Sequence, residues 1–156
     1  MRVVLGVSGA SGAVLALDCA RALARAGAEI DLVLSAMAER TLAEEVRPDA
    51  LGQLQATATR VHPRGDLGAA IASGSCPVAG MIVAPYSMRS LAAIAHGFDD
   101  SLLTRAVILP PVPAFYLRPA SLADVTTQIA ARAVYHLHLA PSQARAWTPE
   151  PAGENP

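Results

Sequence analysis

The chain has 156 residues, of which 53% are apolar and 16% are charged, and its net charge is −1. This length indicates a single domain, and the apolar content excludes an intrinsically disordered chain. The balanced charge argues against a nucleic-acid-binding protein, and the absence of lysine excludes Schiff-base chemistry on a lysine and a Walker-type phosphate loop.

Short apolar runs alternate along the chain with patterns typical of helices. We expect strands at residues 3–8, 30–35, 59–62, 81–85 and 107–109. We expect helices at residues 11–26, 36–46, 49–55, 67–73, 87–106 and 121–139. Gly27 stands where a helix should end, and Ser121 with Asp124 has the spacing of a capping box. The domain then spans residues 1–140, and residues 141–156, with four prolines, form a loose tail.

This alternation predicts a three-layer α/β fold of the Rossmann-like, flavodoxin-like kind. A parallel sheet of about five strands should carry helices on both faces. The carboxyl ends of parallel strands share one edge of the sheet, and ligands bind at that edge. Site residues should therefore come from the loops that follow the strands, at residues 9–12, 35, 85–90 and 110–116.

The first of these loops is rich in glycine, with Gly6, Gly9 and Gly12 around Ser11. Glycines let the backbone approach a ligand closely, and the following helix directs its N–H groups at the same point, which favours a phosphate. The spacing is not that of a dinucleotide loop, and Ser35 stands where such proteins carry an acidic residue, so a mononucleotide is indicated. The alternative is a glycine turn that serves only strand-to-helix packing.

Two later loops can also contact a ligand. Residues 85–90 place a proline and small polar side chains at the start of a helix, which can cradle an isoalloxazine ring or a ribityl chain, or simply cap the helix. Residues 110–116 combine three prolines with Phe115 and Tyr116, which suits a rigid aromatic wall or a plain connection.

Five segments in the same order carry a resemblance to a known family: GASGA (9–13), SGS (73–75), PYSMRS (85–90), LLTRA (102–106) and LPPVPAFYLRP (109–119). They resemble the flavin prenyltransferase family (UbiX/Pad type). The resemblance implies transfer of a dimethylallyl group from dimethylallyl phosphate to reduced FMN, without a metal. It also implies that the prenylated FMN serves a decarboxylase of the UbiD type.

The resemblance also assigns roles to individual residues. It implies catalytic roles for Ser11 and Glu45. It implies contacts to FMN from Gly9, Ala10, Ser11, Ser35, Ser87, Met88, Arg89, Ser90 and Arg105. It implies contacts to the allylic substrate from Tyr116, Arg132 and Trp147. The alternatives are a solvated Glu45, a surface Arg132, and a Trp147 that fills a core or an interface.

The chain departs from the family after Ala106, where it passes directly to residues 107–109. One strand-plus-helix unit of about 30 residues is missing, and with it an arginine, a glutamate and a lysine that the family uses. Three alternatives follow. An active prenyltransferase can use Arg89, Arg105, Arg118 or a neighbouring subunit's arginine instead. The second is an FMN-binding protein without prenyl transfer, which stores or delivers flavin.

The third alternative is a flavin-dependent decarboxylase of the cysteine-decarboxylase type. Residues 85–90 argue against it, and we expect His62 to be loosely held in a proline-rich turn. The remaining histidines and Cys76 lack ligand spacing, so we expect no metal, and Cys19 and Cys76 should be free thiols. No apolar run is long enough for a signal peptide or a membrane span, which predicts a cytoplasmic protein. The apolar composition and the resemblance predict a homo-oligomer, a trimer or a dodecamer.

Overall fold

The computed structural model describes residues 1–72, 77–96 and 119–138. The predictions for Cys76, Arg105, Arg118, Tyr116 and Trp147 lie outside these residues. So do those for the strand at 107–109 and the tail at 141–156.

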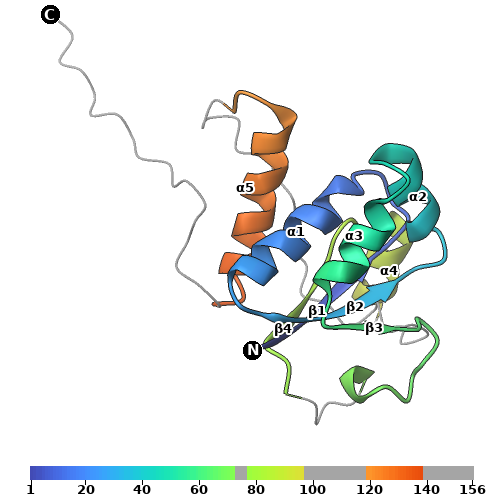
Figure 1. Cartoon of the computed structure of the whole chain (residues 1–156). Coiled ribbons are helices and arrows are strands. Elements are labelled where there is room, and N and C mark those ends of the chain that lie inside the picture. Colours follow the sequence, from blue (N-terminus) through green and yellow to red (C-terminus); the bar gives the residue numbers. More distant parts are fainter. Residues whose placement is uncertain (73–76, 97–118, 139–156) are drawn as a thin grey trace, which may run out of the picture.

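Within the described residues, four parallel strands form one sheet in the order β3-β2-β1-β4. The strands are β1 (Arg2–Val7), β2 (Glu29–Leu34), β3 (Arg60–His62) and β4 (Gly80–Val83). The helices are α1 (Val14–Arg25), α2 (Ala38–Glu45), α3 (Ala50–Thr57), α4 (Met88–Ala95) and α5 (Leu122–Tyr135), with a 3-10 turn η1 (Ala70–Ala72). Figure 1 shows α1, α3 and α5 stacked over one face of the sheet. This confirms the predicted α/β fold.

The central strand β1 shows why the apolar runs form strands buried on both faces. Val3, Leu5 and Val7 belong to the larger core, which α1, α3 and α5 cover. Val4 points to the other face, where it packs with Val33 and against Ala69 and Ile71. Side chains of a strand alternate between the faces, so a strand with helices or loops on both sides needs apolar residues at every position.

Helix α1 begins later than the sequence predicts and ends where it predicts. Gly12 has a φ of +94°, which only glycine adopts readily, so the loop continues to Ala13 and the helix begins at Val14. Gly27, with a φ of +71°, follows the last turn, as predicted for a helix C-terminus. Cys19 is buried in α1, and burial raises the pKa of its thiol to about 12, so it is a neutral core residue.

Other predicted elements are confirmed or corrected. The predicted helix at 67–73 is wrong, because only the short turn η1 forms there, after the glycines Gly65 and Gly68. Helix α3 runs to Thr57, two residues beyond the prediction. The capping box of α5 is present, since Asp124 N–H donates to the Ser121 hydroxyl and the Asp124 carboxylate accepts from Ser121 N–H.

Candidate functional site

The carboxyl ends of β1, β2 and β4 meet at one edge of the sheet, as expected for parallel strands. Backbone hydrogen bonds continue past the strands and join the loops: Ser35 N–H donates to Val7 C=O (2.9 Å), and Ser8 N–H donates to Pro85 C=O (3.2 Å). The loops after β1, β2 and β4, three of the four segments that the sequence singles out, therefore start side by side; residues 110–116 lie outside the described residues.

The glycine loop lies directly against the start of α2. A Cβ added to Gly9 would overlap the Cβ of Met37 and would lie 2.9 Å from the backbone carbon of Met37. The Thr41 hydroxyl donates to the Gly9 carbonyl (3.3 Å) from the same helix. Glycine at position 9 is thus required for this close approach to α2, and its contact with a ligand stays a prediction.

Glu45, the last residue of α2, reaches the same loop. Its carboxylate accepts hydrogen bonds from Gly12 N–H (2.8 Å) and Ala13 N–H (3.0 Å), at the start of α1. These two bonds and one from the Ser11 side chain hold the pKa of Glu45 below its usual value, although some desolvation opposes them. The N–H groups of Gly12 and Ala13 directly precede α1, which has no side-chain cap, so Glu45 places its negative charge beside the positive end of this helix.

This contact bears on two expectations. The sequence predicts a phosphate at the glycine loop and the start of α1; Glu45 accepts from Gly12 N–H and Ala13 N–H, which precede the helix, and the position of the phosphate stays a prediction. The alternative of a merely solvated Glu45 does not hold, because the Ser11 side chain and two backbone N–H groups donate hydrogen bonds to its carboxylate. The structure thus brings together the two residues for which the resemblance implies catalytic roles.

A cleft of about 350 Å³ opens where β2 and β3 end. It is lined by Leu34, Ser35, Ala36, Glu39, Gln55, Val61, His62, Pro63 and Arg64. The Ser35 hydroxyl is buried and has no hydrogen-bond partner among the described residues. A buried hydroxyl without a partner is unfavourable, and a ligand in the cleft would satisfy it. Ser35 therefore fits the flavin-binding role that the resemblance implies.

The loop after β4 is a helix start of ordinary geometry. The Ser87 hydroxyl accepts from Ser90 N–H (3.1 Å) and lies 3.0 Å from the Ser90 hydroxyl, so Ser87 caps α4. Met88 and Arg89 are exposed on the first turn. The serines are thus fixed in place, and Arg89 faces solvent.

Arg132 lies in the last turn of α5, on the end of that helix that approaches the opposite edge of the sheet. Leu137, just beyond this turn, packs against Gly80 at the amino end of β4. Figure 1 shows this end of α5 beside the start of β4, away from α2. Within one chain the structure therefore does not bring Arg132 to the Ser35 cleft.

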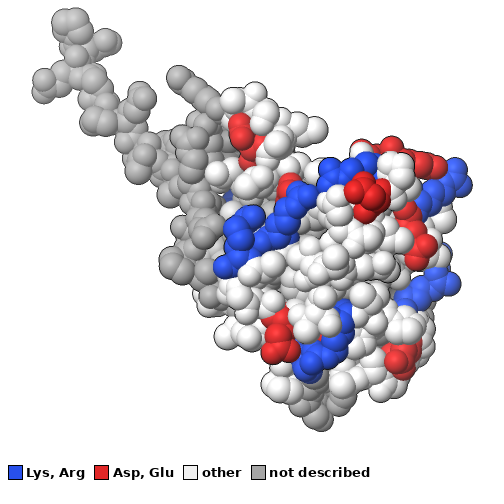
Figure 2. Space-filling model, in the orientation of Figure 1, with Lys and Arg blue, Asp and Glu red and all other residues white. Residues whose placement is uncertain are grey.

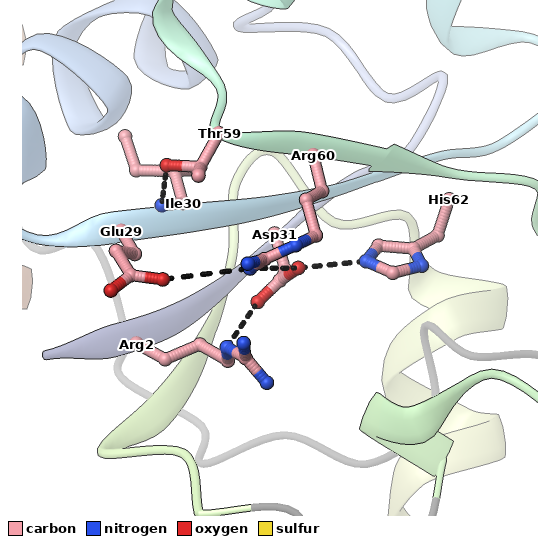
Figure 3. A network of polar contacts seen from close by, with 7 residues as sticks. All are labelled: Arg2, Glu29, Ile30, Asp31, Thr59, Arg60 and His62. Carbon is pink, nitrogen blue, oxygen red and sulfur yellow. Dashed lines mark hydrogen bonds and ion pairs between the residues drawn. The ribbon is translucent and has the colours of Figure 1, made fainter.

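The prediction for His62 is wrong. His62 Nε2 lies 2.7 Å from Asp31 Oδ1, and the imidazole is only 16% exposed. Asp31 is buried in β2 and also pairs with Arg2 (3.2 Å) and Arg60 (3.7 Å). Figure 3 shows these side chains converging on the Asp31 carboxylate from the two strands on either side of β2. No sequence motif announces this pair, because its two residues lie 31 positions apart and meet only through the β2–β3 register.

Three further observations concern surface charge, metal ligands and membrane-spanning helices. On the face that Figure 2 shows, acidic and basic side chains are interspersed among wide uncharged areas, as the balanced charge predicts. Across the described ranges, no three histidine, cysteine, aspartate or glutamate side chains gather as ligands for a metal ion. None of the helices in the described part is both long and apolar enough to span a membrane.

Comparison with known proteins identifies the family. The flavoprotein family model matches residues 1–127. The flavin prenyltransferase UbiX of Thauera aromatica is 40% identical over 164 aligned positions, which cover 82% of this chain and 84% of the relative. The aligned 82% of this 156-residue chain contains fewer residues than the 164 aligned positions. Some residues of the relative therefore have no counterpart in this chain.

Two solved structures share the fold. The crystal structure of AnUbiX (PadA1) in complex with FMN and dimethylallyl pyrophosphate superposes with a TM-score of 0.86 at 31% identity, covering 96% of this chain and 98% of that one. A dodecameric FMN-dependent UbiX-like decarboxylase from Escherichia coli O157:H7 gives 0.85 at 29% identity, covering 96% of this chain and 100% of that one. The chain belongs to the flavin prenyltransferase family of the flavoproteins.

Proposed function

We propose that this protein transfers the dimethylallyl group of dimethylallyl phosphate to reduced FMN and so makes prenylated FMN. Family membership supports this reaction, and the similar AnUbiX structure contains FMN and dimethylallyl pyrophosphate. The observation that carries the proposal is the arrangement at the carboxyl edge of the sheet. There the Ser11–Glu45 cluster lies at the end of α2, just before the start of α1, and the Ser35 hydroxyl lacks a partner in the described structure.

The residues at this edge fit a flavin. Gly9, Ala10 and Ser11 would hold FMN from the β1 loop, and the buried Ser35 hydroxyl would gain the partner that it lacks. Residues 87–90 would hold it from the start of α4, where Ser87 and Ser90 are already fixed by their hydrogen bonds. Reduced FMN supplies the nucleophilic atoms that bond to the allylic carbons.

Glu45 and Ser11 are suited to move a proton in this reaction. The hydrogen bonds from α1 favour the charged form of Glu45, so its carboxylate is ionised at neutral pH and can accept a proton through the Ser11 hydroxyl. The bond between the allylic carbon and phosphate breaks, and the leaving phosphate keeps the electron pair. A first bond from the flavin to that carbon would replace it, and the flavin would give up a proton. A second bond, which closes the extra ring, would take the electron pair of the allylic double bond, with one proton gained by the alkene carbon and one lost from the flavin.

The leaving phosphate needs cations, and the missing unit removes part of the family's set. We propose that Arg89, Arg105 and Arg118 of one subunit, or an arginine of a neighbouring subunit, replace them. Arg132 is a candidate for the second route, because within one chain it lies toward the other edge of the sheet. A guanidinium stabilises a developing phosphate charge by paired hydrogen bonds. Tyr116 and Trp147 would line the allylic pocket.

This route requires a homo-oligomer, which we propose to be a trimer or a dodecamer built from trimers. The dodecameric relative from Escherichia coli O157:H7 supports that assembly. A UbiD-type decarboxylase as the recipient of the product, and a cytoplasmic location, stay predictions.

A second candidate is an FMN-binding protein without prenyl transfer. The shorter alignment with the Thauera aromatica enzyme favours it, because residues of the relative have no counterpart here. Such a protein would keep the flavin contacts and lose the reaction.

One experiment separates these functions. The purified protein is incubated without oxygen with reduced FMN and dimethylallyl phosphate, and the flavin is weighed by mass spectrometry. A flavin heavier by one C5H8 unit supports the transferase, and bound but unaltered FMN supports the second candidate. A protein that retains no flavin contradicts both. Glu45→Gln should lower the yield of product, whereas Glu44→Gln, whose carboxylate pairs with Arg40 on the surface, should not.

A further inference from the structure

We propose that Thr41 is a positioning residue of the flavin site, and that together with Ser8 it fixes the peptide group between Gly9 and Ala10. The inference rests on the proposed function, because it concerns the loop that would hold FMN. The resemblance assigns no role to Thr41 or Ser8. Thr41 acts on the flavin through this loop.

The peptide group between Gly9 and Ala10 is held from two sides. The Thr41 hydroxyl donates to the Gly9 carbonyl at 3.3 Å, and Ala10 N–H donates to the Ser8 hydroxyl at 3.3 Å. The C=O and N–H groups of a trans peptide lie in one plane and point in opposite directions. Rotation of this peptide group would therefore break both hydrogen bonds at once.

The two hydroxyls belong to different layers of the fold. Ser8 directly follows β1, is only 3% exposed, and its N–H donates to Pro85 C=O at 3.2 Å. Thr41 lies in α2, which Figure 1 shows beside the loop that follows β1. Ser8 thus ties the peptide group to the sheet, and Thr41 ties it to a helix.

Helix α2 contacts the loop along one of its faces. Met37, Thr41 and Glu45 are spaced four residues apart, so they lie one above the other on this face. Met37 is in close contact with Gly9, and Glu45 accepts from the two N–H groups directly before α1. Thr41 stands between them, and its hydroxyl reaches the part of the loop just before Ser11.

A loop that contains glycine needs such support. Gly9 has no Cβ, so its backbone has more conformations open to it than that of any other residue. A ligand that binds a mobile loop must first order it, and this lowers the affinity, whereas a loop already held in place binds more tightly. Ser11 follows the held peptide by one residue, so the same two hydroxyls also set where Ser11 stands beside Glu45.

The Thr41 hydroxyl has a second acceptor, and the test must separate the two. It lies 2.9 Å from Met37 C=O in its own helix, so its single hydrogen is shared between two carbonyls. Thr57 makes the same bond in α3, where its hydroxyl donates to Gln53 C=O at 2.9 Å. Thr57→Val therefore removes an equal helical bond in another helix and is the matched control.

The experiment measures FMN binding to the full chain by quenching of flavin fluorescence. A titration gives the dissociation constant and the number of binding sites. Thr41→Val keeps the shape of the side chain and removes the hydroxyl, and we expect it to raise the dissociation constant about three- to tenfold with the number of sites unchanged. Thr41→Ser keeps the hydroxyl, and we expect it and Thr57→Val to stay within about twofold of wild type.

Ser8→Ala tests the other side of the same peptide group. It removes the acceptor of Ala10 N–H, and we expect a loss of FMN affinity of similar size. If Thr41→Val fails to fold, Ser8→Ala and Thr41→Ser still decide the question, because the first should weaken FMN and the second should not.

Three results would overturn the inference. The first is wild-type affinity in Thr41→Val. The second is an equal loss in Thr41→Ser or in Thr57→Val, which would assign the effect to packing or to the helical bond. The third is an unchanged dissociation constant with fewer binding sites in Thr41→Val, because a residue that only supports the fold changes the fraction of folded protein and not the affinity of each site.

Failure of the proposed function gives a different pattern. If wild type binds FMN but forms no prenylated flavin, the transferase proposal fails, while the affinities of the variants still decide the role of Thr41. If wild type binds FMN and forms the product, and Thr41→Val binds FMN equally well, only this inference fails. A wild-type protein that binds no FMN removes both.

Discussion

A single carboxylate, that of Glu45, joins the end of α2 to the start of α1. An acidic residue is unfavourable in the last turn of its own helix, where the dipole is negative. In this fold the same residue accepts hydrogen bonds from Gly12 N–H and Ala13 N–H, directly before the first turn of another helix, where a negative charge is favourable. Glu45 therefore destabilises the end of its own helix α2, and its tertiary contact with the start of α1 compensates for this.

Replacing Glu45 by glutamine should lower the free energy of unfolding by about 0.5–1 kcal/mol at neutral pH, since the hydrogen-bond acceptor remains and the charge is lost. Because the pKa of Glu45 is lowered in the folded state, its charge stabilises the fold above the unfolded-state pKa. That contribution disappears as the pH falls through the folded-state pKa. The difference between wild type and Glu45→Gln in urea denaturation should therefore be full at pH 7, begin to fall near the usual carboxyl pKa of about 4.3, and vanish below the lower folded-state pKa.

Glu44→Gln provides the control for this measurement. Glu44 pairs only with Arg40 at the surface in the described structure, and both side chains are largely exposed. A pH dependence of equal size in Glu44→Gln would contradict the special role of Glu45.

Gly9 offers a second test at the residue scale. In Gly9→Ala the new methyl group would overlap Met37, so the loop or α2 must shift, and the free energy of unfolding should fall by about 1–3 kcal/mol. FMN affinity should fall with it, because the loop moves. Gly52→Ala is the matched control: nothing lies within 4 Å of the added Cβ in α3, so this change should stabilise the protein by about 0.5–1 kcal/mol. Chemical denaturation measures both, and a Gly9→Ala protein as stable as wild type would contradict the packing.

Among the site residues, the sequence predicts some far better than others. Ser35 and the glycine loop could be placed, because each directly follows an apolar run and must lie at the carboxyl edge. The environment of His62 could not, because it depends on a buried aspartate in another strand and on the exact register between them. An aspartate within the apolar run of β2 was the one signal that could have indicated a buried pair.

At the scale of elements, the capping box fixes where α5 begins. Ser121 and Asp124 exchange hydrogen bonds of 3.2 and 3.0 Å, and α5 then packs along α1. Ser121→Ala should therefore lower the free energy of unfolding by about 1 kcal/mol. The comparison variant is Thr127→Ala, an exposed position within the same helix, which should change stability by less than about 0.5 kcal/mol. Thermal unfolding of both proteins gives the answer, and equal stabilities would contradict the role of the cap.

The elements show which sequence signals are reliable. The sequence predicts all four strands of the described sheet within about two residues. A short apolar run bounded by glycine or polar residues is typical of a buried strand and too short for most helices. The sequence predicts too early a start for α1, because the alanines around Gly12 favour a helix while Gly12 itself takes up a positive φ. The segment at 67–73 has helix-forming alanines, yet it forms only the turn η1 that covers the second face of the sheet.

For the whole molecule, parallel pairing decides where the site lies. The order β3-β2-β1-β4 places the ends of β1 and β2 next to each other and beside the end of β4. The sequence predicts such an edge but not the strand order, which depends on crossovers that no local pattern encodes. The position of Arg132 follows from the same topology, because α5 runs along α1 toward the amino ends of the strands.

The account as a whole depends on FMN binding at the carboxyl edge of this sheet. A crystal structure of the protein soaked with FMN tests this most directly. We predict flavin density at the glycine loop and residues 87–90, with the Ser35 hydroxyl hydrogen-bonded to the ligand. An edge that stays empty in excess flavin, or a flavin bound anywhere else on the chain, would contradict the account.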